Sequence, residues 1–518
     1  MPITLGKQLM QTSLVVVALL LEPIEGFHVA RPPITLGRGA CARHWPQLTT
    51  RTDLVEPPPC PPAPPTSDAS TPLVLTLCCG IAAVCALDRV VMSVAILPMS
   101  AQYGYPDSIK GLIAAGFSVG YGLALLPAGA AASSPDISPK TVLLVGLLIW
   151  SAAQAASPLA ASFGVPVLLG ARALMGIGEA AAIPSLQAIA AQFVPRRRRS
   201  LFWGFLSASL SGGTILAYLL SPPLIEDYGW SSAFVAFGGA GLVLAALWAA
   251  FGAAEPAAPL PPDHSGQGGA GGGAGLDAGT PNSAGCIEEA CPAPEGAIML
   301  GGSGRVPWAA IASSRPVWAL TAAHVASNFF LYFALTWLPV FFSYSFGMST
   351  ADSSSASITP FAAGAVGALS AGAACDALVA RAGFSLTDAR KLMQSVACGG
   401  PALALLALAA LGSGWAGLPP LDRASAEAIF TFAIFCQACS AAGFGCAAQD
   451  ISTRLSALLY GATSVAAVAA GAGGQYLTGW LLERNGRDFT PMFELTAAVE
   501  LVGLLLWLRF WDSEKLFE

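Results

Sequence analysis

The chain has 518 residues, of which 55% are hydrophobic and only 10% are charged, and its formal net charge is −6. Soluble domains carry roughly 25% charged residues, so a lipid bilayer must replace water around much of this chain. The small, dispersed net charge excludes the basic patches that bind nucleic acid. No paired motif for hydrolysis, nucleotide binding or redox chemistry is found, so we predict no enzyme, no cofactor and no metal site.

The N-terminal 72 residues are predicted to be an address followed by a spacer. Residues 1–26 contain an apolar run at 14–21 that is too short to span a bilayer and is typical of a signal peptide. Residues 27–72 begin with a basic, acid-free, transit-like stretch and end in a disordered, proline-rich segment at 57–65. This order resembles the two-part address of complex plastids. It predicts the plastid envelope or thylakoid; an ordinary secretory leader, leading to an endomembrane or the plasma membrane, is the alternative.

Twelve apolar runs of about 20 residues follow, each long enough to cross the hydrocarbon core. They lie at 73–97, 109–131, 140–159, 163–190, 201–222 and 231–252, and then at 316–344, 355–375, 390–412, 425–446, 455–481 and 490–511. Backbone groups in lipid must satisfy one another, so these runs are helices. We predict an all-α membrane protein with twelve transmembrane helices in two six-helix bundles, 73–252 and 306–518. A flexible, glycine-rich central loop at 253–305 joins them.

Basic residues in short loops predict the orientation. Arg196 to Arg199 follow the fourth run, and Arg381, Arg390 and Lys391 lie between the eighth and ninth runs. Lys and Arg favour the cytoplasmic side of a membrane, which corresponds to the stroma for a plastid envelope. These loops and both chain ends are therefore predicted to share the inner side.

Four charged residues interrupt the apolar runs, namely Asp88, Arg89, Arg172 and Glu179. A charge at the bilayer centre costs roughly 2.5–3.5 kcal/mol on insertion scales, and such residues are functional by default. At 1.5 Å per residue, Arg89 and Arg172 lie roughly 12–13 Å below the outer face, so their guanidinium groups are expected at one level. Arginine matches carboxylate and phosphate, and a buried acid can bind and release a proton. The alternative is a structural network in which two acids and two bases neutralise one another.

Several segments carry a family resemblance in the right order. The run 85–99 reads CALDRVVMSVAILPM, 172–179 reads RALMGIGE, 336–339 reads TWLP, 390–394 reads RKLMQ and 449–451 reads QDI. Together they resemble the anion:cation symporter family of the major facilitator superfamily, which contains the vesicular glutamate transporters, sialin and plastid-type phosphate transporters. The plant and algal organellar branch is the most similar.

The resemblance implies roles for individual residues. Arg89 and Arg172 would bind the anion, Tyr121 and Asn328 would line its path, and Glu179 would couple protons. We add Asp88, next to Arg89, as a second candidate for proton coupling.

Gating residues are expected in two loops. The loop after the second run of a facilitator normally carries a glycine-rich segment with Asp-Arg, for which Asp136 would substitute here; the counterpart after the eighth run, 372–376 with Asp376, is intact.

Four positions depart from the family's branches. Ser327 stands where the glutamate-transporting branch has arginine, and Ala114 where that branch has histidine. Ala447 and Ala448 replace the Asn-His pair of the plastid phosphate branch. Vesicular glutamate transport is therefore not expected.

The prediction is a secondary active transporter of small anions that works by alternating access and is coupled to H+ or Na+. Inorganic phosphate is the first candidate substrate and an organic anion such as ascorbate or a carboxylate the next. No oligomer is required. The alternative is a non-transporting facilitator relative acting as a sensor or scaffold, which the altered loop at Asp136 favours. His324 and Glu500 also lie inside apolar runs, but the sequence assigns neither of them a role.

Overall fold

The computed structural model describes residues 70–132, 134, 136–193, 199–252, 307–414, 419–452, 455–514 and 516. The predicted signal peptide, the transit-like segment up to residue 69 and the central loop at 253–305 lie outside the described residues. Arg196, Arg197 and Arg198 of the predicted inner loop do so as well.

Every regular element in the described part of the chain is helical. The first half contains α2 (Ser70–Tyr103), α3 (Asp107–Ala132), α4 (Pro139–Ser162), α5 (Val165–Glu179), α6 (Ala182–Phe193), α7 (Arg199–Tyr228) and α8 (Trp230–Phe251). The second half contains α9 (Trp308–Ser313), α10 (Arg315–Phe346), α11 (Thr350–Ala382), α12 (Leu386–Gly412), α13 (Arg423–Gln437), the 3₁₀-helix η2 (Ala438–Ala441), α14 (Phe444–Ile451), α15 (Ser456–Arg484) and α16 (Thr490–Phe510).

Eleven helical segments of the described chain are long and apolar enough to cross a membrane. The 29-residue helix α15 runs beside them, and its length of roughly 44 Å at 1.5 Å per residue suffices for a twelfth span. The prediction of an all-α membrane protein is confirmed. Helices α10 and α11 extend beyond the predicted runs and end at Gly347 and Gly383, whose backbones are left-handed.

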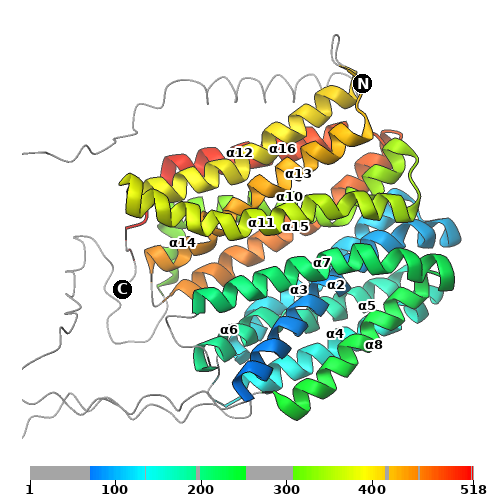
Figure 1. Cartoon of the computed structure of the whole chain (residues 1–518), viewed down its shortest axis with the longest axis horizontal. Coiled ribbons are helices and arrows are strands. Elements are labelled where there is room, and N and C mark those ends of the chain that lie inside the picture. Colours follow the sequence, from blue (N-terminus) through cyan, green and yellow to red (C-terminus); the bar gives the residue numbers. More distant parts are fainter. Residues whose placement is uncertain are drawn as a thin grey trace, which may run out of the picture.

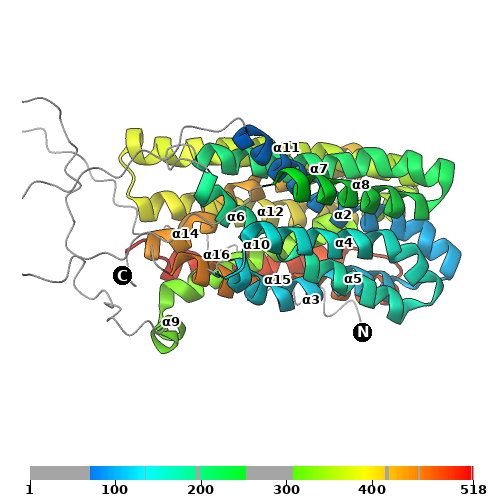
Figure 2. The ribbon, with the colours of Figure 1, turned by 90° about the horizontal axis from the view of Figure 1, so that it is seen from below.

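The first-half helices lie on one side of the molecule and the second-half helices on the other (Figure 1). Helix α2 packs against α7 and α8, and α10 packs against α15 and α16. The two halves meet chiefly where α3 runs along α15 and α7 along α11. Viewed from below, α6, α9 and α14 lie toward the end at which the chain terminates (Figure 2). We call this the inner end, and the end with the α2–α3, α10–α11 and α15–α16 connections the outer end.

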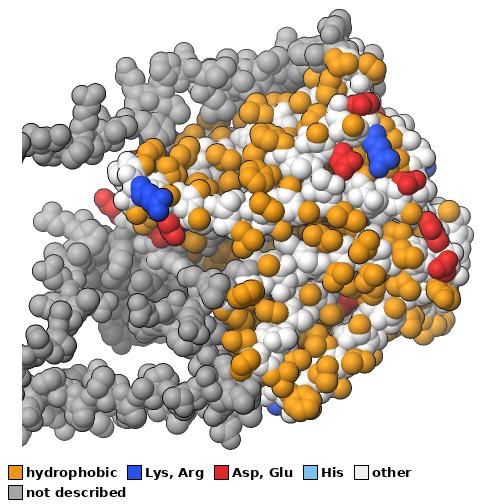
Figure 3. Space-filling view, in the orientation of Figure 1, with side chains coloured by type: hydrophobic (Ala, Val, Ile, Leu, Met, Phe, Trp, Pro, Cys, Tyr) orange, Lys and Arg blue, Asp and Glu red, His pale blue; other side chains and the backbone are white. Residues whose placement is uncertain are grey.

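The lateral surface is apolar. Large hydrophobic side chains such as Leu123 and Leu159 are more than half exposed there. On the face shown in Figure 3, acidic and basic side chains gather toward the two ends, with hydrophobic groups between them. Water disfavours so broad an exposed apolar surface, so this belt is the one that lipid covers.

The fourth membrane segment of each half is interrupted. In the first half α5 ends at Glu179 and α6 begins at Ala182; in the second half α13 gives way to η2 and α14. Pro184 lacks the N–H that would continue the helical hydrogen bonding across the first break. Breaks at corresponding positions of two repeats are typical of transporter binding regions.

One gating prediction placed its segment wrongly. Residues 372–376 are not a loop after the eighth span but part of α11, where Asp376 is exposed. The helix continues past Asp376 and ends at Gly383, whose left-handed φ of 70° terminates it.

Candidate functional site

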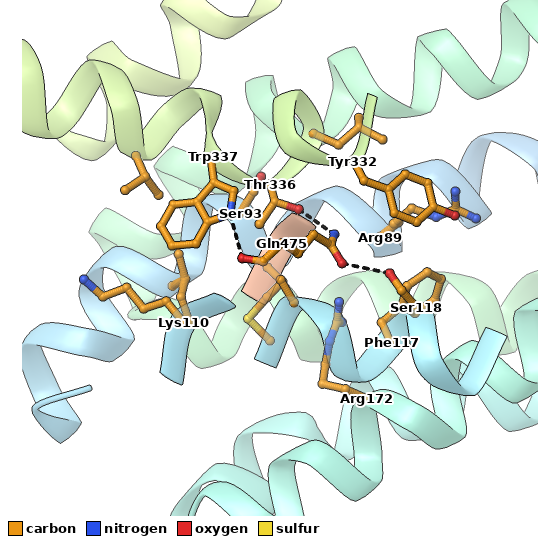
Figure 4. Close-up of a pocket in the computed structure, with 15 residues that line it drawn as sticks. Arg89, Ser93, Lys110, Phe117, Ser118, Arg172, Tyr332, Thr336, Trp337 and Gln475 are labelled. Atoms are coloured by element: carbon orange, nitrogen blue, oxygen red, sulfur yellow. Dashed lines mark hydrogen bonds between the residues drawn. The ribbon is translucent and has the colours of Figure 1, made fainter. Parts of the chain in front are cut away.

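A small cavity lies between the two halves, with a volume of about 30 Å³. Helices α2, α3 and α5 form one wall, and α10 and α15 form the other (Figure 4). The lining residues are Arg89, Met92, Ser93, Ile96, Lys110, Ala114, Phe117, Ser118, Arg172, Tyr332, Leu335, Thr336, Trp337, Val340 and Gln475.

Two guanidinium groups share one aromatic ring on the first-half wall. The central carbon of the Arg89 guanidinium lies 5.1 Å from the centroid of Phe117, and that of Arg172 lies 5.5 Å from the same centroid. Arg89 comes from α2, Phe117 from α3 and Arg172 from α5. The structure therefore brings the two arginines to one place, at the common level that their depths in the sequence indicated.

Arg89 is paired with Glu179. Its terminal amino group forms a short ion pair with Oε1 of Glu179, and its Nε donates to the same oxygen at 3.1 Å. The side chain of Glu179 is completely buried, whereas that of Arg89 keeps 28% of its exposure. Oε2 of Glu179 has no hydrogen-bond partner among the described residues. The acid lies at the last residue of α5, directly before the helix break.

Arg172 is only 2% exposed, yet no ion pair joins it to a carboxylate among the described residues. Its Nη1 donates to the sulfur of Met175 at 3.2 Å, and its Nε has no partner. Burying an arginine without an ion pair is costly. Arg172 therefore has unused hydrogen-bonding capacity at an empty cavity.

Asp88 lies behind this wall rather than on the cavity. It is fully buried, and both carboxylate oxygens lack a hydrogen-bond partner in the described part of the chain. The charged groups that act on it are Glu179 and Arg172. Asp88 therefore offsets the charge of Arg172 from a distance without occupying its donors.

Glycines bring α3 and α5 close enough to build this wall. A Cβ at Gly120 would overlap the carbonyl oxygen of Ala173, and a Cβ at Gly176 would overlap that of Phe117. Small residues at such crossings let helix backbones touch in lipid. Gly120 and Gly176 thus allow the close α3–α5 crossing that brings Phe117 against Arg172.

The second-half wall is polar but uncharged. Gln475 lies at its centre, where its Oε1 accepts from Ser118 of the first half at 2.9 Å and its Nε2 donates to Thr336 at 2.7 Å (Figure 4). The indole of Trp337 donates to the backbone oxygen of Gln475 at 3.2 Å. One hydrogen bond thus crosses between the halves inside the cavity.

The structure places the remaining predicted site residues as follows. Tyr121 stacks on Phe117 and lies 5.4 Å from the Arg89 guanidinium, but it does not line the cavity. Asn328 is half-buried on α10 and also lies off the cavity; Tyr332, one turn further along, lines it. Asp136 is exposed in the α3–α4 connection, where its backbone N–H donates to Ser134.

Two further ionisable groups lie inside the second half. His324 is buried, contacts the hydroxyl of Thr463 at 3.1 Å and stacks on Phe444. Glu500 is fully buried beside the Cys398 thiol, and neither of its oxygens has a hydrogen-bond partner in the described region. Neither residue lines the cavity.

Several cavity residues were missed by the sequence analysis. Lys110 lies at the start of the second apolar run, where a lysine is expected to reach the membrane interface. Gln475 was overlooked, although it is an amide inside the apolar run 455–481. Thr336 and Trp337 were noted only as part of a motif. Because these residues come from different helices, only their packing shows that they meet.

Residues 77–456 match the family model of the Major Facilitator Superfamily, and the chain belongs to this superfamily. It is 32% identical over 456 residues to an Arabidopsis thaliana protein named sodium-dependent phosphate transport protein 1, chloroplastic, with 86% of this chain and 80% of the relative covered. It is also 32% identical to the chloroplastic ascorbate transporter of the same plant, covering 86% and 76%. These relatives confirm the resemblance to the plant organellar anion transporters.

Solved structures support the fold. A bacterial homologue of the human lysosomal transporter Spinster, inward-facing and occupied, matches with a TM-score of 0.60 at 16% identity, covering 86% of this chain and 96% of that one. A D-xylose–proton symporter matches with a TM-score of 0.59 at 14% identity, covering 86% and 98%. The predicted major facilitator fold is confirmed. The chain is a multi-pass plastid membrane protein of a transporter family and not an enzyme.

Proposed function

We propose that this protein is a secondary active transporter of small anions, coupled to H+ or Na+, whose binding site is the Arg89–Arg172 wall of the cavity. Residues 73–252 and 306–518 would act as the two rocking units. Alternating access around a fixed site between two repeats is the working principle of this architecture.

The observation that carries the proposal is the unpaired guanidinium of Arg172. It is buried, lines the cavity, and its Nε has no hydrogen-bond partner among the described residues. A planar guanidinium matches the paired oxygens of phosphate or carboxylate, and an anion bound there would supply the countercharge that this arginine lacks. Inorganic phosphate is the first candidate and ascorbate the second, in keeping with the names of the relatives.

The Arg89–Glu179 pair supplies a means of coupling. While Glu179 is charged, it holds Arg89. Protonation of Glu179 would remove that attraction and leave Arg89 free to bind the anion next to Arg172. A sodium ion at the unpartnered oxygens of Glu179 and Asp88 would weaken the pair in the same way. Binding of the cation would release Arg89 for the anion, and binding of the anion to Arg89 would release Glu179 for the cation. Each would therefore favour binding of the other.

Residues beside the cavity and at the inner end are assigned to control access to the binding site. Tyr121 holds the Arg89 guanidinium through its ring, and Asn328 lies along α10 toward the inner end. Asp136 and Asp376 are assigned as gating residues of the inner end, and both residues are exposed.

The test is uptake into proteoliposomes. Labelled phosphate, ascorbate and a dicarboxylate would be offered with a proton gradient, with a sodium gradient and with neither. We expect one anion to accumulate only with one of the gradients. If no anion accumulates under any condition, while the purified protein still binds one of them, the protein acts as a non-transporting sensor or scaffold and the transport proposal is wrong.

A further inference from the structure

The outer end of the cavity is closed by a cluster of charged and hydroxyl groups that the transport proposal above does not use. Lys110 of α3 lies 2.6 Å from Oδ1 of Asp107, and the hydroxyl of Tyr344 on α10 donates to the same oxygen at 2.6 Å. Lys110 also forms a short hydrogen bond with that hydroxyl. Arg487, in the α15–α16 connection, lies 3.5 Å from Oδ2 of Asp107. We call these four residues the outer latch.

The latch joins the two halves of the molecule. Asp107 and Lys110 belong to the first half, whereas Tyr344 and Arg487 belong to the second. The Arg487 guanidinium also lies over the Tyr344 ring, 4.4 Å from its centroid. One turn away, the backbone N–H of Ser108 donates to Glu483 of the second half at 3.2 Å. Opening the outer end would break the contacts that join the halves; the Asp107–Lys110 pair within α3 and the Arg487–Tyr344 contact within the second half could persist.

The backbone is shaped for this closure. A Cβ at Gly479 of α15 would overlap the carbonyl oxygen of Asp107, so the two helices touch directly at the latch. Arg487 is the only non-glycine residue with a positive φ, 69°, in the described chain. A left-handed backbone is unfavourable for residues with a Cβ, so holding the guanidinium over Tyr344 and Asp107 costs conformational energy that the contacts must offset.

Lys110 connects the latch to the cavity. It is only 5% exposed, and it lines the same cavity as Arg89 and Arg172, with Arg89 and Lys110 at opposite ends of the view in Figure 4. In the closed state Asp107 and Tyr344 occupy its donors. Separation of the halves removes Tyr344 and Arg487. Lys110 keeps its ion pair with Asp107 but regains the donor that Tyr344 occupied, at the mouth of the cavity.

We propose that the outer latch holds the outer end shut, and that its opening presents Lys110 as the first cation that an anion entering from the outer side meets. This proposal rests on the transport function proposed above. A small oxyanion such as phosphate would pass from Lys110 to Arg172. Lys110 is therefore assigned to anion capture from the outer side alone. When the protein is open to the inner side, the outer latch is closed and Lys110 does not meet an entering anion.

The first experiment compares Lys110→Gln with wild type in oriented proteoliposomes with labelled phosphate. We expect the KM for phosphate offered on the outer side to rise about tenfold, and the KM on the inner side to change less than twofold. Lys110→Arg should restore most of the outer affinity. Equal shifts on both sides would show that Lys110 only supports the fold, and would overturn the capture role.

The second experiment uses Arg487→Gly, which removes the guanidinium and suits the left-handed backbone. We expect the outer end to open more easily, so that a maleimide probe labels an introduced cysteine, Val340→Cys on the cavity wall, at least threefold faster from the outer side. The matched control is Arg484→Gly, which alters an exposed arginine of the same end and should leave labelling unchanged. Equal labelling in both variants contradicts the latch.

The third experiment separates this proposal from the transport function. Ser108→Cys combined with Glu483→Cys should form a disulfide on oxidation, stop phosphate uptake and recover it on reduction, while either single variant should not respond. If wild type transports no anion, the transport proposal fails, and the yield of the disulfide by mass spectrometry still tests the closed latch. If wild type transports and the oxidised double variant does so equally well, the latch is wrong.

Discussion

The two halves of the protein interrupt the same membrane segment and stabilise the break in different ways. In the first half α5 stops at Glu179, whose carboxylate holds Arg89 at the cavity. In the second half the break before α14 is capped by a neutral amide, because the backbone N–H of Phe444 donates to Oε1 of Gln394 at 3.1 Å. The same amide donates to Ser327 at 3.3 Å. Under the proposed coupling, the first break would respond to a proton or a cation, whereas the second is a hydrogen-bonded joint formed by a neutral amide.

The difference extends to the cavity walls. The first half supplies Arg89, Arg172 and Lys110, and the second half supplies tyrosine, threonine, tryptophan and glutamine. Ser327, where the glutamate-transporting branch has arginine in the resemblance noted above, fits this division. We infer that the first half holds the anion and the coupling ion, while the second half closes over them with neutral groups.

The most severe test of this division is Arg172→Ala. Loss of two charge-assisted hydrogen bonds, each worth about 1.5–3 kcal/mol, should lower phosphate uptake at least about 100-fold, since 1.4 kcal/mol is a factor of ten. The matched control is Arg509→Ala, which removes an exposed arginine at the end of α16 and should transport normally. Size-exclusion profiles would show that both variants fold. If Arg172→Ala took up phosphate as fast as wild type, the first half would not bind the anion as proposed.

Glu179→Gln tests the responsive break. The amide keeps the shape of the side chain but cannot hold Arg89 as a charged partner or take up a proton. We expect gradient-driven uptake to fall about tenfold, while exchange of internal for external anion continues, because binding and rocking remain possible. Both modes would be measured in the same proteoliposomes. A normal response to the driving gradient would show that coupling lies elsewhere.

Gln475→Leu tests the neutral wall. It removes hydrogen bonds to Ser118 and Thr336, each worth about 0.5–1.5 kcal/mol. We expect a three- to tenfold rise in KM, well below the loss in Arg172→Ala. Gln449→Leu, at an exposed position of α14, is the control. An effect of Gln475→Leu as large as that of Arg172→Ala would show that both halves bind the anion equally.

The smallest effect is expected from Glu500→Gln, which makes the same chemical change as Glu179→Gln in the other half. Glu500 is remote from the cavity lining, and its oxygens make no hydrogen bond within the described residues. Uptake should stay within about twofold of wild type, and thermal stability in detergent should be unchanged or higher, because a buried unpaired charge is costly. Loss of the gradient response would reveal a second coupling acid and abolish the contrast between the halves.

The sequence alone determined the membrane class, the helical architecture and the four intramembrane charges. Those conclusions follow from hydrophobic length and the cost of charge in lipid, which act residue by residue along the chain. The proximity of Arg89 and Arg172, which contact the same Phe117 ring, was also predicted, because helical rise is constant. Hydropathy could not show that Asn328 lies off the cavity while Tyr332 lines it. The two residues lie one turn apart on the same face of one helix, and only the packing of the two halves shows where along that face the cavity ends.

Tertiary structure decided which charges are paired. Glu179 binds Arg89 and leaves Arg172 without an ion pair among the described residues, whereas the sequence offered two acids and two bases and did not fix which of them pair. It also placed Lys110 at the cavity and joined it to Tyr344, more than 200 positions away in the sequence. Such contacts depend on how helices from the two halves cross, and no local sequence pattern determines where two helices cross. The chemistry available to this protein was set by its residues, and their partners were set by packing.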